Sequence, residues 1–392
     1  MSNKICIVTL VSDQTAPNVI FLKWCVKKYG NDHTRIVLVS TEKMEQKASS
    51  THIKNALEPY QALFANPLKV NEYDIEDIKN TLSGTINVDD YEQVIVNITG
   101  GTKIMSLAVY LYFHTKHNVC IFYQALGKPA LQQLYPAGDF LQFDETITVR
   151  EYFKAYGIQA NYTNSCIKDW EFNRKVLPLL ENNHDMRNLL TCMQNIRKVK
   201  KKFEKKTYLD ITTFDYDLLQ QEIKKDRFPA DIVSKAEMLT KENVSACISQ
   251  FGFDDKKLKN SELRYITGGW FEEYVYQKIK YEEGIADENI ALNVQISIKD
   301  TKNELDVVYI DNRNALHIIE CKSFIDETEQ SELLSNTLYK IQALRSQCGL
   351  SARPELYTMS EITKESPLGR AKTFDITIKD RSKMLNACEN CE

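Results

Sequence analysis

The sequence predicts an α/β protein in which an N-terminal, doubly wound parallel sheet is joined to a mixed sheet nearer the C-terminus. Three observations support this prediction. In the first 150 residues, β-branched runs alternate with helical stretches; residues 166–258 are charged and helical; and after about residue 259 the order is helix, three strands, helix, strand. We therefore divide the chain into a domain at 1–144, a hinge at 145–165, a helical lead-in at 166–258 and a second α/β domain at 259–392.

The N-terminal strands are predicted from four near-continuous apolar runs, as expected for strands buried on both faces. They lie at residues 5–11, 35–39, 93–98 and 119–123. Helical stretches at about 18–28, 41–60, 75–82 and 103–114 are long enough to form right-handed crossovers between parallel strands. The expected architecture is therefore Rossmann-like.

The C-terminal elements begin with a helix from about residue 268 to 281. Three strands are expected at 290–298, 304–310 and 316–323, a helix at 329–347, and short strands near 355–359 and 374–378. Residues 145–165 lose the strand pattern, which indicates a hinge.

Composition indicates a folded, cytoplasmic protein without a membrane span. Of its 392 residues, 43% are apolar and 27% charged, and the net charge is only −4, so nucleic-acid contacts require local basic patches or metal ions. One basic run, residues 197–206, could follow a phosphate backbone or form a solvated helix face. Cysteines such as Cys6 and Cys321 lie in apolar or mixed segments and suit a reducing compartment, and we interpret the terminal pair Cys388 and Cys391 as incidental.

A predicted hairpin carries the acidic residues with the clearest chemical pattern. Residues 304–310 and 316–322 flank a turn centred on Arg313, which places Asp306 directly opposite Glu320. Lys322 lies two residues further on, and so on the same face as Glu320. Two carboxylates at this distance repel each other unless a cation or proton lies between them.

This Asp, Glu and Lys set suits a hard divalent ion such as Mg²⁺ or Mn²⁺, with Asp306 and Glu320 as metal ligands. The ion would polarise a phosphate and lower the pKa of a water, while Lys322 orients that water or neutralises charge. The alternative is a structural ion pair on a half-exposed sheet.

The pattern Asp306 with Glu320-Cys321-Lys322, preceded by a helical glutamate, resembles the D…ExK signature of the restriction-endonuclease (PD-(D/E)xK) superfamily. The resemblance implies a phosphodiesterase with a further acidic residue on the first helix. Glu272 or Glu273 matches by position, and we favour Glu272, although adjacent helical residues point about 100° apart. Lys340 and Gln342 on the following helix either contact phosphate or belong to a solvated support helix.

A glycine turn at residues 97–105 follows a buried strand and opens a helix, the position at which α/β sheets bind ligands. Glycines allow close approach of the backbone, and the helix N-terminus favours a phosphate. A turn made only for packing is the alternative. The loop after the first strand and the residue after the second reach the same edge of the sheet. Together they form a polar cleft that could bind a nucleotide, although Ser, Asn and Thr at such places are also ordinary helix caps. The residues of this cleft are Ser12, Gln14, Thr15, Asn18, Thr41, Asn97, Thr99, Gly100, Gly101, Thr102 and Lys103.

The N-x-T-G-G-T-K-x-M stretch in this strand order resembles the CARF domain, the nucleotide sensor of type III CRISPR systems. Together with the D…ExK pattern it implies a homodimeric effector nuclease of antiviral defence. That resemblance further implies a cyclic oligoadenylate activator, expected to be cyclic tetra-adenylate, and cleavage or nicking of DNA and cleavage of RNA. Two other functions are considered: a regulatory protein with an inactive nuclease fold, and a CARF protein that degrades its own cyclic nucleotide.

Overall fold

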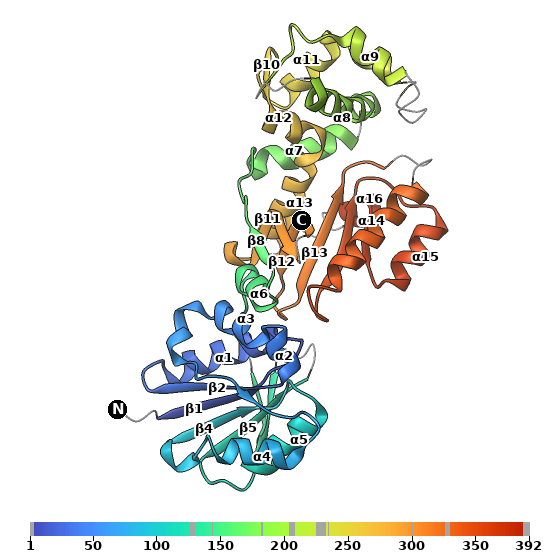
Figure 1. The fold of residues 1–392 in the computed structure, drawn as a ribbon. Coiled ribbons are helices and arrows are strands. Elements are labelled where there is room, and N and C mark those ends of the chain that lie inside the picture. Colours follow the sequence, from blue (N-terminus) through green and yellow to red (C-terminus); the bar gives the residue numbers. More distant parts are fainter. Residues whose placement is uncertain are drawn as a thin grey trace.

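A computed structural model describes residues 4–125, 130–142, 144–181, 183–203, 208–224, 233, 235–298, 301–325 and 330–386. Figure 1 shows an elongated molecule in three parts: the N-terminal sheet at one end, the C-terminal sheet in the middle and a helical group at the far end. Cys388 and Cys391 lie outside the described residues, and the side chains of the predicted basic run do as well.

The N-terminal sheet has the order β3-β2-β1-β4-β5-β6-β7, with β1 to β5 parallel, as predicted, and β6 and β7 antiparallel. Its strands are β1 (Ile5–Leu10), β2 (Thr34–Ser40), β3 (Leu68–Lys69), β4 (Gln93–Asn97), β5 (Val119–Gln124), β6 (Ala130–Tyr135) and β7 (Phe140–Gln142). The short strands β3, β6 and β7 were not predicted, because β3 and β7 are only two and three residues long and the apolar residues of β6 do not alternate with polar ones.

Helices cover both faces of this sheet, because side chains alternate along each strand. One face packs against α1 (Ala16–Tyr29) and α3 (Ser49–Ala56), and the other against α4 (Ile75–Ser83) and α5 (Lys103–Phe113). The helix predicted at 41–60 is divided into α2 (Glu42–Gln46), α3 and η1 (Glu58–Leu63). The division falls at Ala48, whose φ of 57° cannot continue a helix.

The helical part is more complex than predicted. It contains α7 (Trp170–Glu181), α8 (His184–Phe203), α9 (Tyr216–Lys224), α11 (Lys241–Gln250) and α12 (Asn260–Arg264). It also contains a two-stranded antiparallel sheet, formed by β9 (Tyr208–Asp210) and β10 (Lys257–Lys259). Long-range pairing of two three-residue strands leaves no periodic signal in the sequence.

The C-terminal sheet has the order β15-β14-β13-β12-β11-β8. Its strands are β8 (Gln159–Asn161), β11 (Ile290–Ile298), β12 (Thr301–Ile310), β13 (Leu316–Lys322), β14 (Arg353–Thr358) and β15 (Thr377–Lys379). Helix α13 (Trp270–Glu282) packs on one face, and α14 (Gln330–Arg345) and α15 (Glu365–Thr373) cover the other near β14 and β15. The chain ends its described part with α16 (Arg381–Asn386).

The segment predicted as a hinge is ordered structure that joins both sheets. It contains α6 (Val149–Ala155), which packs on α3, and β8, which pairs with β11 at the edge of the C-terminal sheet. One hydrophobic core includes residues of α1, α6, β12 and the end of α14, so it extends across both domains. Among the described residues, no helix is long and apolar enough to cross a membrane.

Candidate functional site

The register of the β12–β13 hairpin agrees with the prediction. Val307 pairs with Ile319 and Ile310 with Leu316, so Asp306 and Glu320 are the next opposed residues. Asn314 adopts a left-handed φ of 61° in the connecting turn, which an Asn tolerates better than most residues. The Cys321 backbone N–H donates to Asp306 Oδ2 at 2.7 Å, which ties the two strands together at the acidic pair.

Glu320 is buried and held by two lysines. Lys322 Nζ lies 2.6 Å from Oε1, and Lys340 Nζ, from α14, lies 2.7 Å from Oε2. Burial alone would raise the pKa of Glu320, but the two lysines outweigh it and lower that pKa. Burial likewise works against the charge of Lys322, yet Glu320 and Asp306 raise its pKa. Both groups are therefore charged at neutral pH, and Lys322 is a poor proton acceptor.

Asp306 is compensated only in part, by the charge of Lys322 and the hydrogen bond from the Cys321 N–H. It is 9% exposed, and burial, together with the charges of Glu320 and Glu272, raises the pKa of its carboxyl well above the usual value. The pKa of Glu272 is raised too, chiefly by burial, with Arg264 acting in the opposite direction. Glu272 Oε2 is buried and has no hydrogen-bond partner in the described part of the chain. An acceptor left in this state is costly unless another group supplies positive charge.

The structure distinguishes the two helical glutamates. Glu273 accepts hydrogen bonds from the backbone N–H groups of Ile167 and Lys168, at 2.8 and 3.2 Å, and so anchors the start of the helical part. Glu272 lies within electrostatic range of Glu320 and Lys322. This arrangement agrees with the choice of Glu272 for the acidic cluster.

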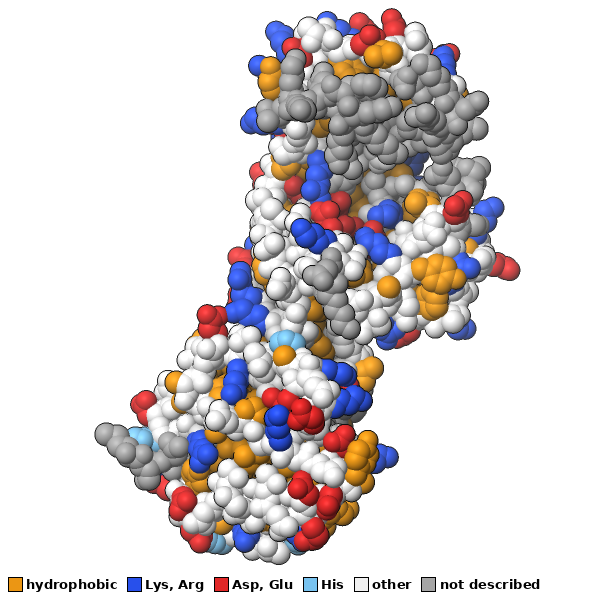
Figure 2. Space-filling model, viewed as in Figure 1, with side chains coloured by type: hydrophobic (Ala, Val, Ile, Leu, Met, Phe, Trp, Pro, Cys, Tyr) orange, Lys and Arg blue, Asp and Glu red, His pale blue; other side chains and the backbone are white. Residues whose placement is uncertain are grey.

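Two further residues border the cluster and were not predicted. Arg264, at the end of α12, lies 2.5 Å from Glu304 of β12, and its charge also acts on Glu272 and Asp306. No sequence signal linked Arg264 to β12, because they are 40 residues apart and share no motif. Figure 2 shows a small acidic area bordered by Lys and Arg side chains where the helical part meets the C-terminal sheet.

The chemistry of the acidic cluster suits a divalent ion. It offers three carboxylates, one of which has a buried oxygen with no partner among the described residues, and this is the kind of hard-oxygen set that Mg²⁺ or Mn²⁺ prefers. In the described part of the chain, however, no three His, Cys, Asp or Glu residues are already arranged to hold a metal ion. The chemistry of the residues fits the ion, while both oxygens of Glu320 are bonded to lysines.

The glycine turn lies at the carboxyl edge of the parallel sheet, between β4 and α5, as predicted. Gly101 has a φ of 73°, and a Cβ at Gly100 would overlap the carbonyl oxygen of Leu10. Both glycines therefore have a packing reason, whatever else they do. Thr102 caps α5 by accepting from Met105 N at 3.2 Å, and Lys103 is exposed in its first turn.

Several predicted contact residues have internal partners. Asn18 Nδ2 donates to Thr9 Oγ1 and to the carbonyl oxygen of Leu10, both at 2.8 Å. Asn97 Oδ1 accepts from the backbone and hydroxyl of Thr99, which in turn accepts from Gln124 N. Thr15 donates to the carbonyl oxygen of Ala155, and Thr41 caps α2. These side chains shape the edge of the sheet. Those with exposed or half-exposed positions are Ser12, Gln14, Thr99, Gly100, Gly101, Thr102 and Lys103.

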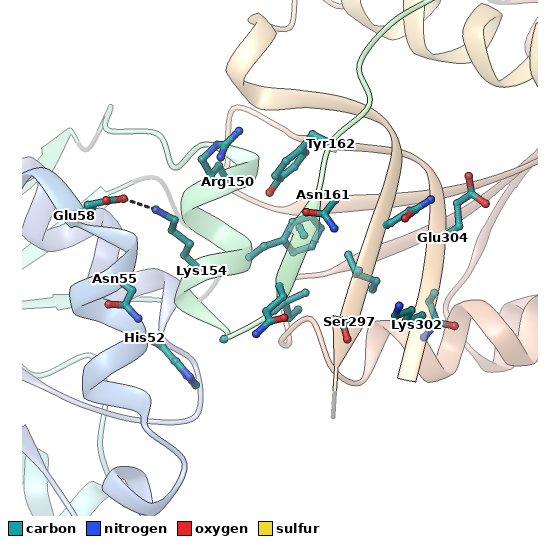
Figure 3. Close-up of a pocket in the computed structure, with 18 of the residues that line it drawn as sticks. His52, Asn55, Glu58, Arg150, Lys154, Asn161, Tyr162, Ser297, Lys302 and Glu304 are labelled. Atoms are coloured by element: carbon teal, nitrogen blue, oxygen red, sulfur yellow. Dashed lines mark hydrogen bonds and ion pairs between the residues drawn. The ribbon is translucent and has the colours of Figure 1, made fainter. Parts of the chain in front are cut away.

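A groove of about 1090 Å³ lies between the two sheets. Figure 3 shows its walls: α3 and α6 on one side, and β8, β11 and β12 on the other, with Lys154 bonded to Glu58. Arg150 lies over the Tyr162 ring, 4.9 Å from its centroid. The groove extends to Glu304, two residues before Asp306 along β12.

Comparisons with known proteins identify two domain families in the chain. The Card1 CARF domain family matches residues 6–152, and the Card1-like endonuclease domain family matches residues 259–387. Among curated proteins, none matches.

Two solved structures have the same overall fold. Can2 from Sulfobacillus thermosulfidooxidans, in complex with cyclic tetra-adenylate, is 24% identical with a TM-score of 0.68, over 98% of this chain and 97% of that chain. Protein VC1899 from Vibrio cholerae is 19% identical with a TM-score of 0.68, over 98% of this chain and 96% of that chain. With both family matches, which together span well over half of the sequence, the chain belongs to the CARF-domain effectors that carry an endonuclease domain of the Card1 type.

Proposed function

We propose that this protein is an endonuclease of CRISPR antiviral defence that depends on a divalent metal and is activated by a cyclic oligoadenylate. It hydrolyses phosphodiester bonds, cleaving or nicking DNA and cleaving RNA. The observation that carries the proposal is the buried cluster of Asp306, Glu320 and Glu272 beside Lys322, within a Card1-like endonuclease domain. A purely structural ion pair would satisfy its buried carboxylate oxygens, whereas Glu272 Oε2 in this cluster has no hydrogen-bond partner among the described residues.

In the proposed mechanism, Asp306 and Glu320 would hold Mn²⁺ or Mg²⁺, and Glu272 would supply a further acidic oxygen. When bound, the ion would polarise the scissile phosphate and activate a water. Lys322 remains protonated, because its carboxylate neighbours raise its pKa, and it therefore orients the water or neutralises charge on the phosphate. The backbone N–H of Cys321 holds Asp306 in place through its hydrogen bond to Oδ2.

The activator is proposed to be cyclic tetra-adenylate, bound at the carboxyl edge of the N-terminal sheet. Can2, which shares the fold, was solved with this ligand. Gly100, Gly101 and Thr102 leave the start of α5 open to a phosphate, and Lys103 adds a cation beside it. Ser12 and Gln14 border the same edge, while Thr15, Asn18, Thr41, Asn97 and Thr99 support it from within.

A homodimer is proposed from the exposed face of α5. Ile104, Leu107 and Leu111 are 37%, 50% and 41% exposed, and their spacing places them on one side of the helix. This apolar stripe begins beside the glycine turn, so a two-fold partner packed on it would bring two ligand clefts together.

The eight cysteines of the described part are all free, which supports a cytoplasmic location.

The test is cleavage of labelled DNA and RNA by the purified protein, with and without cyclic tetra-adenylate and Mn²⁺. We expect cleavage only when both are present. Binding of the ligand without cleavage would indicate a regulatory protein, and disappearance of the ligand without cleavage would indicate that the CARF domain degrades it.

A further inference from the structure

Helix α14 contacts the acidic cluster, and its C-terminal end lies beside the sensor domain, which is the N-terminal part of the chain up to and including α6. Lys340, in its second half, binds Glu320 Oε2 at 2.7 Å. A rise of 1.5 Å per residue places Lys340 about 8 Å from the helix end at Arg345. Two further backbone hydrogen bonds, from Gln347 and Cys348, extend the turn beyond that end. The lysine that binds Glu320 and the end of α14 that lies beside the sensor domain therefore belong to one short, rigid element.

The loop after α14 is fitted to the sensor domain. Gln14 Oε1 accepts hydrogen bonds from the backbone N–H of Leu350 at 2.8 Å and from the Tyr156 hydroxyl at 3.1 Å. The Tyr152 hydroxyl donates to the carbonyl oxygen of Cys348 at 2.7 Å. Gly349 has a φ of 91°, and a Cβ there would overlap the Tyr156 hydroxyl. Three residues of this loop, Cys348, Gly349 and Leu350, thus depend on the position of the sensor domain.

The residue that holds this loop belongs to the edge where the activator is proposed to bind. Gln14 follows β1, and its backbone N–H donates to Ser12 Oγ at 3.3 Å. Ser12 Oγ would lie 3.4 Å from a Cβ at Gly100, so the loop packs directly on the glycine turn. A phosphate bound at that turn would contact or displace the loop that carries Gln14.

We propose that Lys340 is a positioning residue that withholds Glu320 from the metal ion in the ligand-free chain, and that Gln14 controls Lys340 through α14. This inference rests on the proposed function and specifies how the activator reaches the nuclease site. Lys322 and Lys340 together occupy both oxygens of Glu320, so an entering cation must displace at least one of them. A shift of α14 by about 1 Å lengthens the Lys340 contact beyond hydrogen-bonding distance.

The space between the domains permits such a shift. Apart from the shared core and the Gln14 contacts, the groove in Figure 3 separates α3 from β11 and β12, so the two sheets do not pack continuously. A ligand can move α14 only to the extent that it binds the shifted state more tightly. The two states differ in their contacts because, in the shifted state, the Leu350 N–H no longer donates to Gln14 Oε1.

The experiment measures Mn²⁺ affinity of the full-length protein from the EPR signal of free Mn²⁺, with and without cyclic tetra-adenylate. We expect the ligand to tighten Mn²⁺ binding about tenfold, a typical coupling between sites. Lys340→Met should bind Mn²⁺ as tightly without the ligand as the wild type does with it, and Lys340→Arg should behave as the wild type. Lys379→Met is the matched control, because Lys379 is a half-buried lysine near a buried glutamate of the same sheet, Glu355, at 3.6 Å.

A second variant tests the other end of the helix. Tyr156→Phe removes one of the two donors to Gln14, so ligand-free Mn²⁺ affinity should rise part of the way toward that of Lys340→Met. Linkage also requires Mn²⁺ to tighten cyclic tetra-adenylate binding by the same factor. If the wild type responds to the ligand while ligand-free Lys340→Met binds Mn²⁺ no more tightly than the wild type, this inference is wrong and the proposed function stands. Absence of Mn²⁺ binding in every state would instead overturn the proposed function.

Discussion

Two regions differ in how their polar groups are hydrogen-bonded. They are the carboxyl edge of the N-terminal sheet, called the ligand edge because the activator is proposed to bind there, and the acidic cluster of the C-terminal sheet. At the ligand edge, Asn18 and Asn97 are buried but bonded to neighbouring side chains and backbone. In the acidic cluster, burial raises the pKa of Asp306, and Glu272 Oε2 has no partner in the described part of the chain. The first site is already organised without a ligand. The second remains electrostatically incomplete until positive charge is added, so its residues should contribute to function at the expense of stability.

The largest effect is expected for the acidic cluster. Asp306→Ala or Glu320→Ala should reduce cleavage by at least about a thousandfold, because either change removes a proposed metal ligand. Asp306→Asn should be equally inactive, yet more stable in metal-free buffer, because it removes a buried carboxyl that is repelled by Glu320 and Glu272 and is compensated only in part. Cleavage assays and thermal melts check both parts. Cyclic tetra-adenylate binding should stay unchanged, and an active Asp306→Ala protein would eliminate the proposed site.

Lys103→Ala tests the ligand edge. Lys103 is exposed at the start of α5, where a cation is unfavourable by about 0.3–1 kcal/mol unless an anion lies nearby. The variant should be as stable as the wild type or slightly more so, while the activator concentration at half-maximal cleavage rises about tenfold. Lys79→Ala, in α4 of the same domain, is the control. An unchanged midpoint would remove Lys103 from the ligand site, whereas a normal midpoint with a lower plateau would assign it to transmission between the domains.

Asn18→Ala should lower stability more than activator affinity, the reverse of what is expected for Lys103→Ala. The Leu10 carbonyl and the Thr9 hydroxyl would lose the donor that Asn18 provides inside the protein. We expect the free energy of unfolding to fall by about 1–2 kcal/mol, with a smaller change in activator affinity than in Lys103→Ala. Urea denaturation and ligand titration measure the two quantities separately. A stable variant with much weaker binding would mean that Asn18 contacts the ligand directly.

A smaller effect is expected at His317 on β13, remote from the ligand edge. Burial acts to lower its pKa, but hydrogen bonds to Asp311 and Glu355 raise it above the usual value. A raised folded-state pKa means that this stabilisation is complete below the unfolded pKa of about 6.5 and is lost as pH rises through the folded pKa. The wild type should therefore lose stability relative to His317→Gln as pH increases above about 6.5. Parallel curves for the two proteins across this range would show that the charge of His317 contributes nothing.

Much of the fold was predictable because its signals are local. The apolar runs of β1, β2, β4 and β5 are typical of strands buried on both faces, and the glycine turn was correctly placed between β4 and α5. The hairpin register followed from counting residues to the turn, which put Asp306 opposite Glu320. The hinge assignment missed α6 and β8, because β8 is three residues long and is stabilised only by pairing with β11.

The sequence by itself determined the four long strands of the N-terminal sheet, the helix and three strands that begin the C-terminal α/β part, and the register of the acidic hairpin, because hydrophobic periodicity and turn residues act over short distances along the chain. Only the tertiary structure decided which of two adjacent glutamates faces the cluster, since Glu273 bonds to backbone more than 100 residues away. It also placed Lys340 on Glu320, and it placed Gln14 against Leu350, 336 residues later in the chain. Contacts of this kind depend on how separate elements pack, and no local pattern in a single sequence encodes the packing partner.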